Sequence, residues 1–160
     1  MKKVCVSELI KNLFYLEEVL GRKPPERVIE EGKILHRELG FHQEQYHFQK
    51  IIKFENELYL IVGTPDRIEE DCIVELKTYR NLNKVDFLKE VGRTQANIYC
   101  WLSGFKRYKV YLYNVNLAKF TNIIEGIADY EKAEKDIKSA LKIKKELADK
   151  NNKKLQNYQA

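Results

Sequence analysis

The sequence predicts a single α/β domain in which a mixed sheet is flanked by helices. Its 160 residues are an ordinary length for one domain. Hydrophobic residues make up 44% and charged residues 33%, which is enough for a buried core and too apolar for a disordered chain. The spacing of apolar residues also changes from a helical period to a period of two and back again.

Two helices are expected at the start of the chain. Ser7 is a suitable N-cap for an amphipathic helix over residues 7–21, in which leucines recur at helical spacing. Pro24 and Pro25 interrupt the pattern, since proline is disfavoured inside a helix. A second helical pattern follows over residues 26–39.

The period then becomes that of strands, because polar and apolar residues alternate or apolar residues form short runs. Glu70 and Asp71 are expected to form a turn. The expected strands are residues 48–54, residues 58–62 with a continuation at 67–68, and residues 73–77.

The remaining chain predicts a helix over residues 86–103, a strand over 108–115 and a long helix over 117–150. Residues 151–160 are polar and are expected to fray, so we place the domain at residues 1–150, with the last helix as its extension. An apolar stripe on this helix is available to dock on its own domain or on a second copy, which would make a homo-oligomer. Its residues are Ile127, Ile137, Leu141 and Ala148.

The net charge of +5 is unevenly distributed along the chain. Residues 1–76 carry a net charge of −4, residues 77–109 carry +6, and residues 131–160 carry +4. Such basic blocks are typical either of a surface that binds a polyanion such as nucleic acid or of solvated helix faces.

Other classes of protein are excluded by simple features of the sequence. No apolar run approaches the roughly 18–20 residues of a membrane span, and the basic start is not followed by the apolar core of a signal peptide. Cys5, Cys72 and Cys100 are odd in number and lack CxxC spacing, which argues against a disulfide framework or a cysteine zinc site. We therefore expect a cytoplasmic protein with reduced thiols and no membrane partner.

An acidic pair is predicted on neighbouring strands. Glu75 and Lys77 share one face of the strand 73–77. If Glu70 and Asp71 form a two-residue hairpin loop, paired residue numbers sum to 141, which places Asp66 directly across from Glu75. Two facing carboxylates repel unless one is protonated or a cation lies between them, either Lys77 or a divalent metal ion. A surface strand with ordinary Asp/Glu–Lys pairs would have the same sequence.

Four short motifs in this order resemble the PD-(D/E)XK nuclease superfamily. Pro65-Asp66 and Glu75-Leu76-Lys77 match its central motif, and the superfamily has a restriction-endonuclease-like αβββαβ core. Gly32-x3-His36 and Gln95-x3-Tyr99 resemble the first and last motifs of its RecB-like type. On the first of these motifs, Gly32 would also permit a close backbone approach.

The resemblance implies a metal-dependent DNA nuclease that hydrolyses phosphodiester bonds with a metal-activated water, as an exonuclease or on single strands and ends. Mg²⁺ or Mn²⁺ would be bound by His36, Asp66, Glu75 and the Leu76 carbonyl. Lys77 would orient or deprotonate the attacking water and stabilise charge in the transition state, while Gln95 and Tyr99 would contact substrate or brace Lys77. The catalytic set is thus Asp66, Glu75, Lys77, Gln95 and Tyr99, and the basic residues for DNA are Arg80, Lys84, Arg93 and Lys106.

The start Val6-Ser7-Glu8-Leu9-Ile10 and the GxxxH motif are similar to the CRISPR-associated exonucleases of the RecB type. Those proteins carry four cysteines for an iron–sulfur cluster. Here no cysteine stands at 12–16 and none follows Cys100, so we expect a cluster-free relative. Two other functions remain open: a DNA-binding or assembly subunit without catalysis, and a structure-specific endonuclease. His42 and His47 are left out of the metal set because neither has a carboxylate partner.

Overall fold

The computed structural model describes residues 1–19, 21, 26–41 and 46–159. The interpretations of Pro24, Pro25 and His42 lie outside these residues. The elements follow along the chain as β1 (Lys2–Cys5), α1 (Val6–Phe14), α2 (Leu16–Val19), α3 (Glu26–Glu38), β2 (Phe48–Phe54), β3 (Glu57–Gly63), β4 (Arg67–Glu69), β5 (Cys72–Tyr79), the short 3₁₀ helix η1 (Leu82–Lys84), α4 (Val85–Ser103), β6 (Arg107–Asn114), β7 (Lys119–Ile127) and α5 (Tyr130–Gln159).

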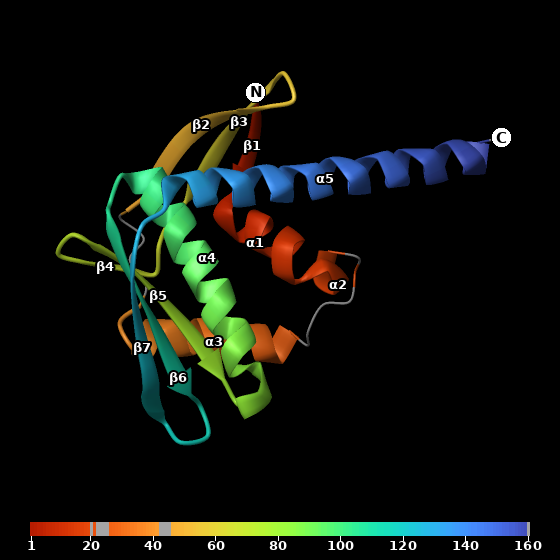
Figure 1. Ribbon diagram of the computed structural model, residues 1–160. Coiled ribbons are helices and arrows are strands. Elements are labelled where there is room, and N and C mark those ends of the chain that lie inside the picture. The colour runs from red at the N-terminus through yellow and green to blue at the C-terminus, as the bar shows by residue number, and fades with distance from the viewer. Residues whose placement is uncertain (20, 22–25, 42–45, 160) are drawn as a thin grey trace.

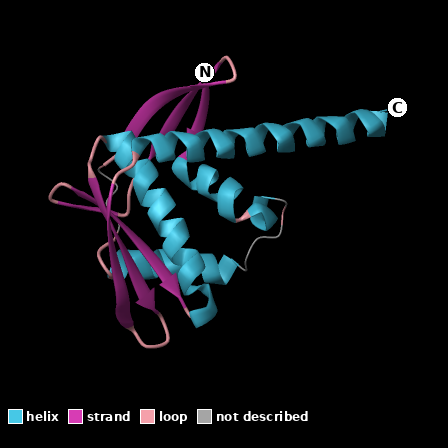
Figure 2. Ribbon diagram, viewed as in Figure 1, coloured by secondary structure: helices cyan, strands magenta, loops and turns pink. Residues whose placement is uncertain are grey.

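The strands form two mixed sheets that are covered by helices, which confirms the α/β class (Figure 2). One sheet has the order β1-β3-β2, and the other has the order β4-β5-β6-β7. β1 is parallel to β3 and β5 is parallel to β6, while the other pairs are antiparallel. The expected αβββαβ core has one more strand than predicted, because residues 67–69 form the separate strand β4 in the second sheet and do not continue β3. The first predicted helix is divided into α1 and α2, and Ser7 lies inside α1, whose N-cap is Cys5.

The predicted hairpin register is confirmed. Arg67 pairs with Val74, and Glu69 pairs with Cys72. The turn lies at Glu70, which has a φ of 50°. The register that the two-residue loop implies therefore holds along the whole of β4.

Two further parts of the predicted architecture are wrong. The helix expected over residues 117–150 begins only at Tyr130, because residues 119–127 form β7. A tight turn after β6, in which Ala118 has a φ of 50°, returns the chain antiparallel to β6. The threonine and isoleucines of β7 favour a strand, since β-branched side chains pack well on a pleated sheet. The other error is the strand β1, which the sequence analysis missed because it has only four residues.

The helix α4 is the central helix of the core (Figure 1). Eleven of its residues are buried, among them Trp101. Gly92 lets α4 approach the sheet closely, since a Cβ there would lie 2.5 Å from Cγ1 of Val110 on β6. A Cβ at Gly92 would also lie 3.5 Å from Cγ of Lys77 on β5. The face of β5 that carries Glu75 and Lys77 therefore lies directly under this helix.

The long helix α5 packs on the core through its first half, where Ala133, Ile137, Ala140 and Leu141 are buried. It continues through Gln159, past residue 150 where we expected fraying to begin, and extends beyond the rest of the molecule in Figure 1. Ile127 is not part of the helical stripe, because it ends β7 and is 80% exposed. None of the helices in the described ranges has the length and apolar character of a membrane span.

Candidate functional site

Asp66 and Glu75 meet at the predicted position. The backbone N–H of Asp66 donates a hydrogen bond to Oε1 of Glu75 over 3.1 Å. The backbone N–H of Leu76 donates in turn to Oδ2 of Asp66 over 2.8 Å. Glu75 is only 1% exposed, so its carboxyl group is held at the bottom of the site. The hairpin therefore fixes both carboxyl groups through the backbone of the opposite strand.

His36 reaches the same point from α3. Its Nδ1–H donates to the Gly32 carbonyl over 2.8 Å, and its Nε2 lies 3.0 Å from the Leu76 carbonyl. The same Nε2 is 3.5 Å from Oδ2 of Asp66. Both ring nitrogens thus face carbonyl oxygens, which accept hydrogen bonds and cannot donate them. Only the doubly protonated imidazolium satisfies both contacts, and it also pairs with the Asp66 carboxylate.

The pKa values of these groups are displaced in the directions that this geometry implies. Burial lowers the pKa of His36, but the hydrogen bond and charge of Asp66 and the two carbonyls outweigh it, so the pKa is raised. Burial raises the pKa of Asp66, but the hydrogen bond and charge of His36 outweigh it and the pKa is lowered. Burial first, and then the charge of Asp66, raise the pKa of Glu75 well above its ordinary value, although Lys77 opposes this. The charge of Asp66 thus acts to raise the pKa of both of its neighbours, His36 and Glu75.

The donors of this site fit a hard divalent cation. Nε2 of His36, the Leu76 carbonyl and Oδ2 of Asp66 turn their lone pairs toward one another, which is unfavourable unless a proton or a cation lies among them. Carboxylate oxygens, a backbone carbonyl and an imidazole are ligands of Mg²⁺ or Mn²⁺. In their present positions, however, no three His, Cys, Asp or Glu side chains of the described residues form a group that could hold a metal ion. The carboxyl group of Glu75 faces the Asp66 backbone instead.

Lys77 lies two residues further along β5 and is held by α4. Its Nζ donates to Oε1 of Gln95 over 2.5 Å. The Gln95 side chain also hydrogen-bonds Tyr99, one turn further along α4. Burial, and then the negative charges of Glu75 and Asp66, raise the pKa of Tyr99 well above its usual value, so its hydroxyl keeps its proton. Gln95 and Tyr99 are therefore placed to orient the ammonium group of Lys77.

His36 and Asp66 line a cavity of about 520 Å³, which we call the catalytic cavity. Lys33 and Arg37, four residues apart on α3, also line it. These two residues were not among the predicted site residues, because residues 1–76 are net acidic. Their positions in the sequence could still have indicated that they lie near the site, since each is within one helical turn of His36.

The four basic residues predicted for DNA separate into two groups. Arg80 and Lys84 line another cavity, of about 390 Å³, on the side of α3 that Val28 and Leu35 face. Arg93 is exposed on α4, two positions before Gln95, and therefore about 160° away from it around the helix. Lys106 is exposed beyond the C-terminal end of α4. The structure thus brings only Arg80 and Lys84 near the α3 side of the site.

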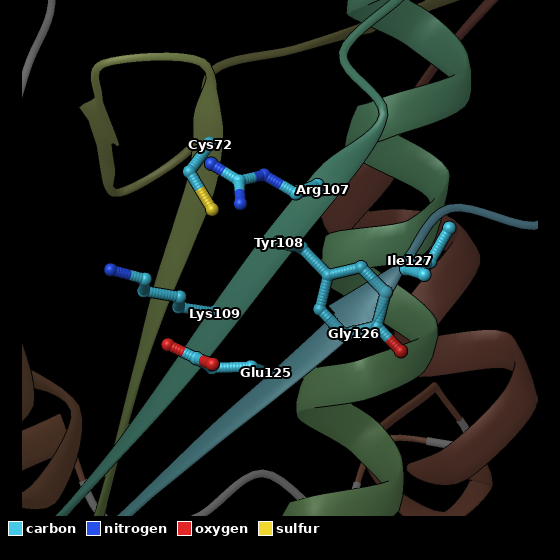
Figure 3. A pocket seen from close by; sticks show the side chains of 7 residues that line it. All are labelled: Cys72, Arg107, Tyr108, Lys109, Glu125, Gly126 and Ile127. Carbon is cyan, nitrogen blue, oxygen red and sulfur yellow. The ribbon is translucent and has the colours of Figure 1, made fainter.

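A further cavity, of about 300 Å³, lies over β5, β6 and β7 and contains none of the predicted site residues (Figure 3). Its two cations already have partners, because Arg107 lies 2.8 Å from Asp71 and Lys109 lies 3.5 Å from Glu69. Its Cys72 is buried, and burial raises the pKa of the thiol, which makes it a poor nucleophile. We find no reactive arrangement in this cavity.

Two solved structures resemble this chain along most of its length. The crystal structure of SSO0001 has a TM-score of 0.66 and 18% sequence identity, and the match covers 89% of this chain and 75% of that protein. A phage-related exonuclease from Haemophilus somnus 129PT has a TM-score of 0.53 and 14% identity, with 91% of this chain and 81% of that protein covered. No family model and no curated protein sequence matches the chain. At such low identities the likeness establishes the fold.

Proposed function

We propose that this protein is a metal-dependent nuclease that hydrolyses phosphodiester bonds in DNA at single strands or ends. One observation carries the proposal: the acceptor atoms of His36, Asp66 and Leu76 converge beside a buried Glu75, with a lysine two residues away on the same strand. The fold shared with a phage-related exonuclease supports the same reaction class.

The metal ion would be held by His36, Asp66, Glu75 and the Leu76 carbonyl. When bound, Mg²⁺ or Mn²⁺ supplies Lewis acidity toward a phosphate oxygen and lowers the pKa of a water molecule. A metal ion and a proton compete for the same lone pairs, so the raised pKa values of His36 and Glu75 make metal binding more favourable as the pH rises.

Lys77 acts on the phosphate as a fixed positive charge. Its ammonium group already donates to an amide oxygen of Gln95, so it is oriented before substrate arrives. A donor fixed in this way stabilises negative charge that develops on a phosphate oxygen, without reorganisation during the reaction. Lys33 and Arg37 provide two further cations along the catalytic cavity, where they neutralise neighbouring phosphates.

The experiment measures cleavage of end-labelled single-stranded and blunt duplex DNA with Mg²⁺ or Mn²⁺. We expect wild type to cut and Glu75→Ala and Lys77→Ala to lose activity, with exposed Lys150→Ala as the matched control. A circular single strand distinguishes exonuclease from endonuclease, and labelled RNA tests the choice of nucleic acid. Cleavage that survives both substitutions, or that proceeds in excess EDTA, would refute the assigned site. Wild-type binding without cleavage under any metal would favour the non-catalytic subunit.

A further inference from the structure

The 390 Å³ cavity is distinct from the catalytic cavity and is lined by a different kind of residue. Aromatic rings of Tyr15 and Phe87 stand on one side of it, and the cations Arg80 and Lys84 line it as well. We call it the aromatic cavity. The proposed hydrolysis uses neither of its aromatic rings, so the reaction does not explain why they line this cavity.

The two cavities meet at Gly32 on α3. Gly32 lines both of them. It stands one helical turn, about 6 Å, from His36 along the helix axis. A Cβ at Gly32 would have nothing within 4 Å among the described residues, so the expectation that this glycine serves a close backbone approach is wrong for them. No packing in the described structure requires a glycine here, although glycine is a poor helix former. Its missing side chain leaves an open passage over α3.

The rings in the aromatic cavity are held in a fixed arrangement. Phe87 makes edge-to-face contacts with Phe14 and Tyr15, at centroid distances of 6.0 and 5.6 Å. It remains 38% exposed. A rigid, partly exposed ring of this kind is a suitable platform for a planar, unpaired nucleobase.

Charges at the cavity suit a strand with a phosphate backbone. Arg80 is oriented by the side-chain oxygen of Asn116 at 3.3 Å and by Glu31 at 3.2 Å, a carboxylate that also lines the cavity and offsets part of the charge of Arg80. Lys84, at the end of η1, adds a second cation. Together with Lys33 and Arg37 in the catalytic cavity, positive side chains stand on both sides of Gly32. A neutral apolar ligand would make no favourable electrostatic interaction with these charges.

We propose that the aromatic cavity binds an unpaired base of the same DNA strand whose phosphate lies in the catalytic cavity, and that the strand crosses α3 at Gly32. This proposal rests on the nuclease function proposed above and names its substrate as an unpaired strand or a frayed end. A base inside a duplex cannot occupy the site, because its faces are covered by the neighbouring base pairs. The volume of about 390 Å³ also excludes a double helix.

The test uses a short fluorescein-labelled oligothymidylate and the full-length protein in EDTA, so that no strand is cut. Fluorescence anisotropy measures its affinity for wild type, Phe87→Ala and Gly32→Leu. Each variant has a matched control away from both cavities: Tyr130→Ala removes a ring of similar exposure (37%), and Asn151→Leu places a leucine at an exposed position of another helix. Leucine at Gly32 improves helix propensity, so this variant folds at least as well as wild type. Thermal unfolding of every variant verifies this.

We expect Phe87→Ala to weaken binding by about 5- to 100-fold, the range of one base–aromatic stack. Gly32→Leu should weaken it at least as much, while both controls stay within about 2-fold of wild type. Wild-type affinity in Phe87→Ala and Gly32→Leu would overturn the proposal. An equal loss for a blunt duplex of the same length would overturn it too, since stacking on an unpaired base would then not be the cause. Failure of the nuclease function is a separate result, namely a wild type that cuts no nucleic acid with any metal.

Discussion

Replacing Glu75 by glutamine should make the metal-free protein more stable while it removes activity. The amide is nearly the same size as the carboxyl group and keeps an oxygen to accept the Asp66 N–H. It removes the negative charge that burial and Asp66 disfavour at this position, which is the reason for the raised pKa of Glu75. Because the pKa is raised in the folded state, wild type loses stability as the pH rises above the ordinary value of 4.5.

The magnitude is bounded by proton linkage. Each pH unit above the ordinary pKa of 4.5 adds at most about 1.4 kcal/mol, so the loss at about pH 8 cannot exceed about 5 kcal/mol. We expect Glu75→Gln to gain about 1–3 kcal/mol there, the cost of burying a polar group without a good partner. Near pH 4.5 the two proteins should be equally stable, since Glu75 is then protonated in the folded state.

Urea denaturation in EDTA between about pH 4.5 and pH 8 measures this difference. The exposed Glu146→Gln is the matched control and should stay within about 0.5 kcal/mol of wild type at every pH. Saturating Mg²⁺ or Mn²⁺ should then reverse the order, because an ion at about 1,000 times its dissociation constant stabilises wild type by about 4.1 kcal/mol. A Glu75→Gln protein that is less stable than wild type at about pH 8 in EDTA would refute the reasoning.

Three further predictions, made with four substitutions, concern the site and the packing of the helix above it. Lys77→Met should lower kcat at least about 100-fold in single-turnover assays, while binding of uncut DNA is retained; unchanged kcat would remove Lys77 from the reaction. Lys33→Ala and Arg37→Ala should each reduce the slope of log affinity against log salt by about 0.7–1, as measured by anisotropy; an unchanged slope means no phosphate contact. Gly92→Ala should destabilise the fold by about 1–3 kcal/mol in urea, because its Cβ would lie 2.5 Å from a methyl group of Val110; wild-type stability would show that α4 can shift.

The parts of the site that were predictable from sequence depend on local geometry. A two-residue loop fixes the register of a hairpin, so the sum of 141 was sufficient to place Asp66 opposite Glu75. The spacing of four residues in a helix likewise places Gln95 beside Tyr99. The fold class followed from the helical period of about 3.6 residues and the strand period of about two residues, which depend on neighbouring residues alone.

The parts that were missed depend on contacts between distant segments or on competing local preferences. β1 is stabilised by pairing with β3, more than fifty residues later in the chain. The four residues of β1 do not by themselves predict this pairing. The sequence of β7 was predicted to be helical, with Ile127 on the apolar stripe, whereas its β-branched side chains favour the sheet. A role for Lys33 and Arg37 was not predictable, because it depends on α3 lying beside Asp66, a residue of a distant segment, in the catalytic cavity.

The buried acidic pair also bears on the choice between an enzyme and a non-catalytic subunit. Burial lowers the pKa of His36 but the hydrogen bond and charge of Asp66 raise it, while burial and then the charge of Asp66 raise the pKa of Glu75. A chain that only bound DNA would gain stability from an amide at Glu75 and would lose no contact to a phosphate, since this side chain is 1% exposed. An arrangement that opposes folding and is relieved by a cation makes physical sense where the cation is needed for a reaction. The raised pKa of Glu75 and the proposed hydrolysis therefore have one cause, which is the meeting of Asp66 and Glu75 across the hairpin.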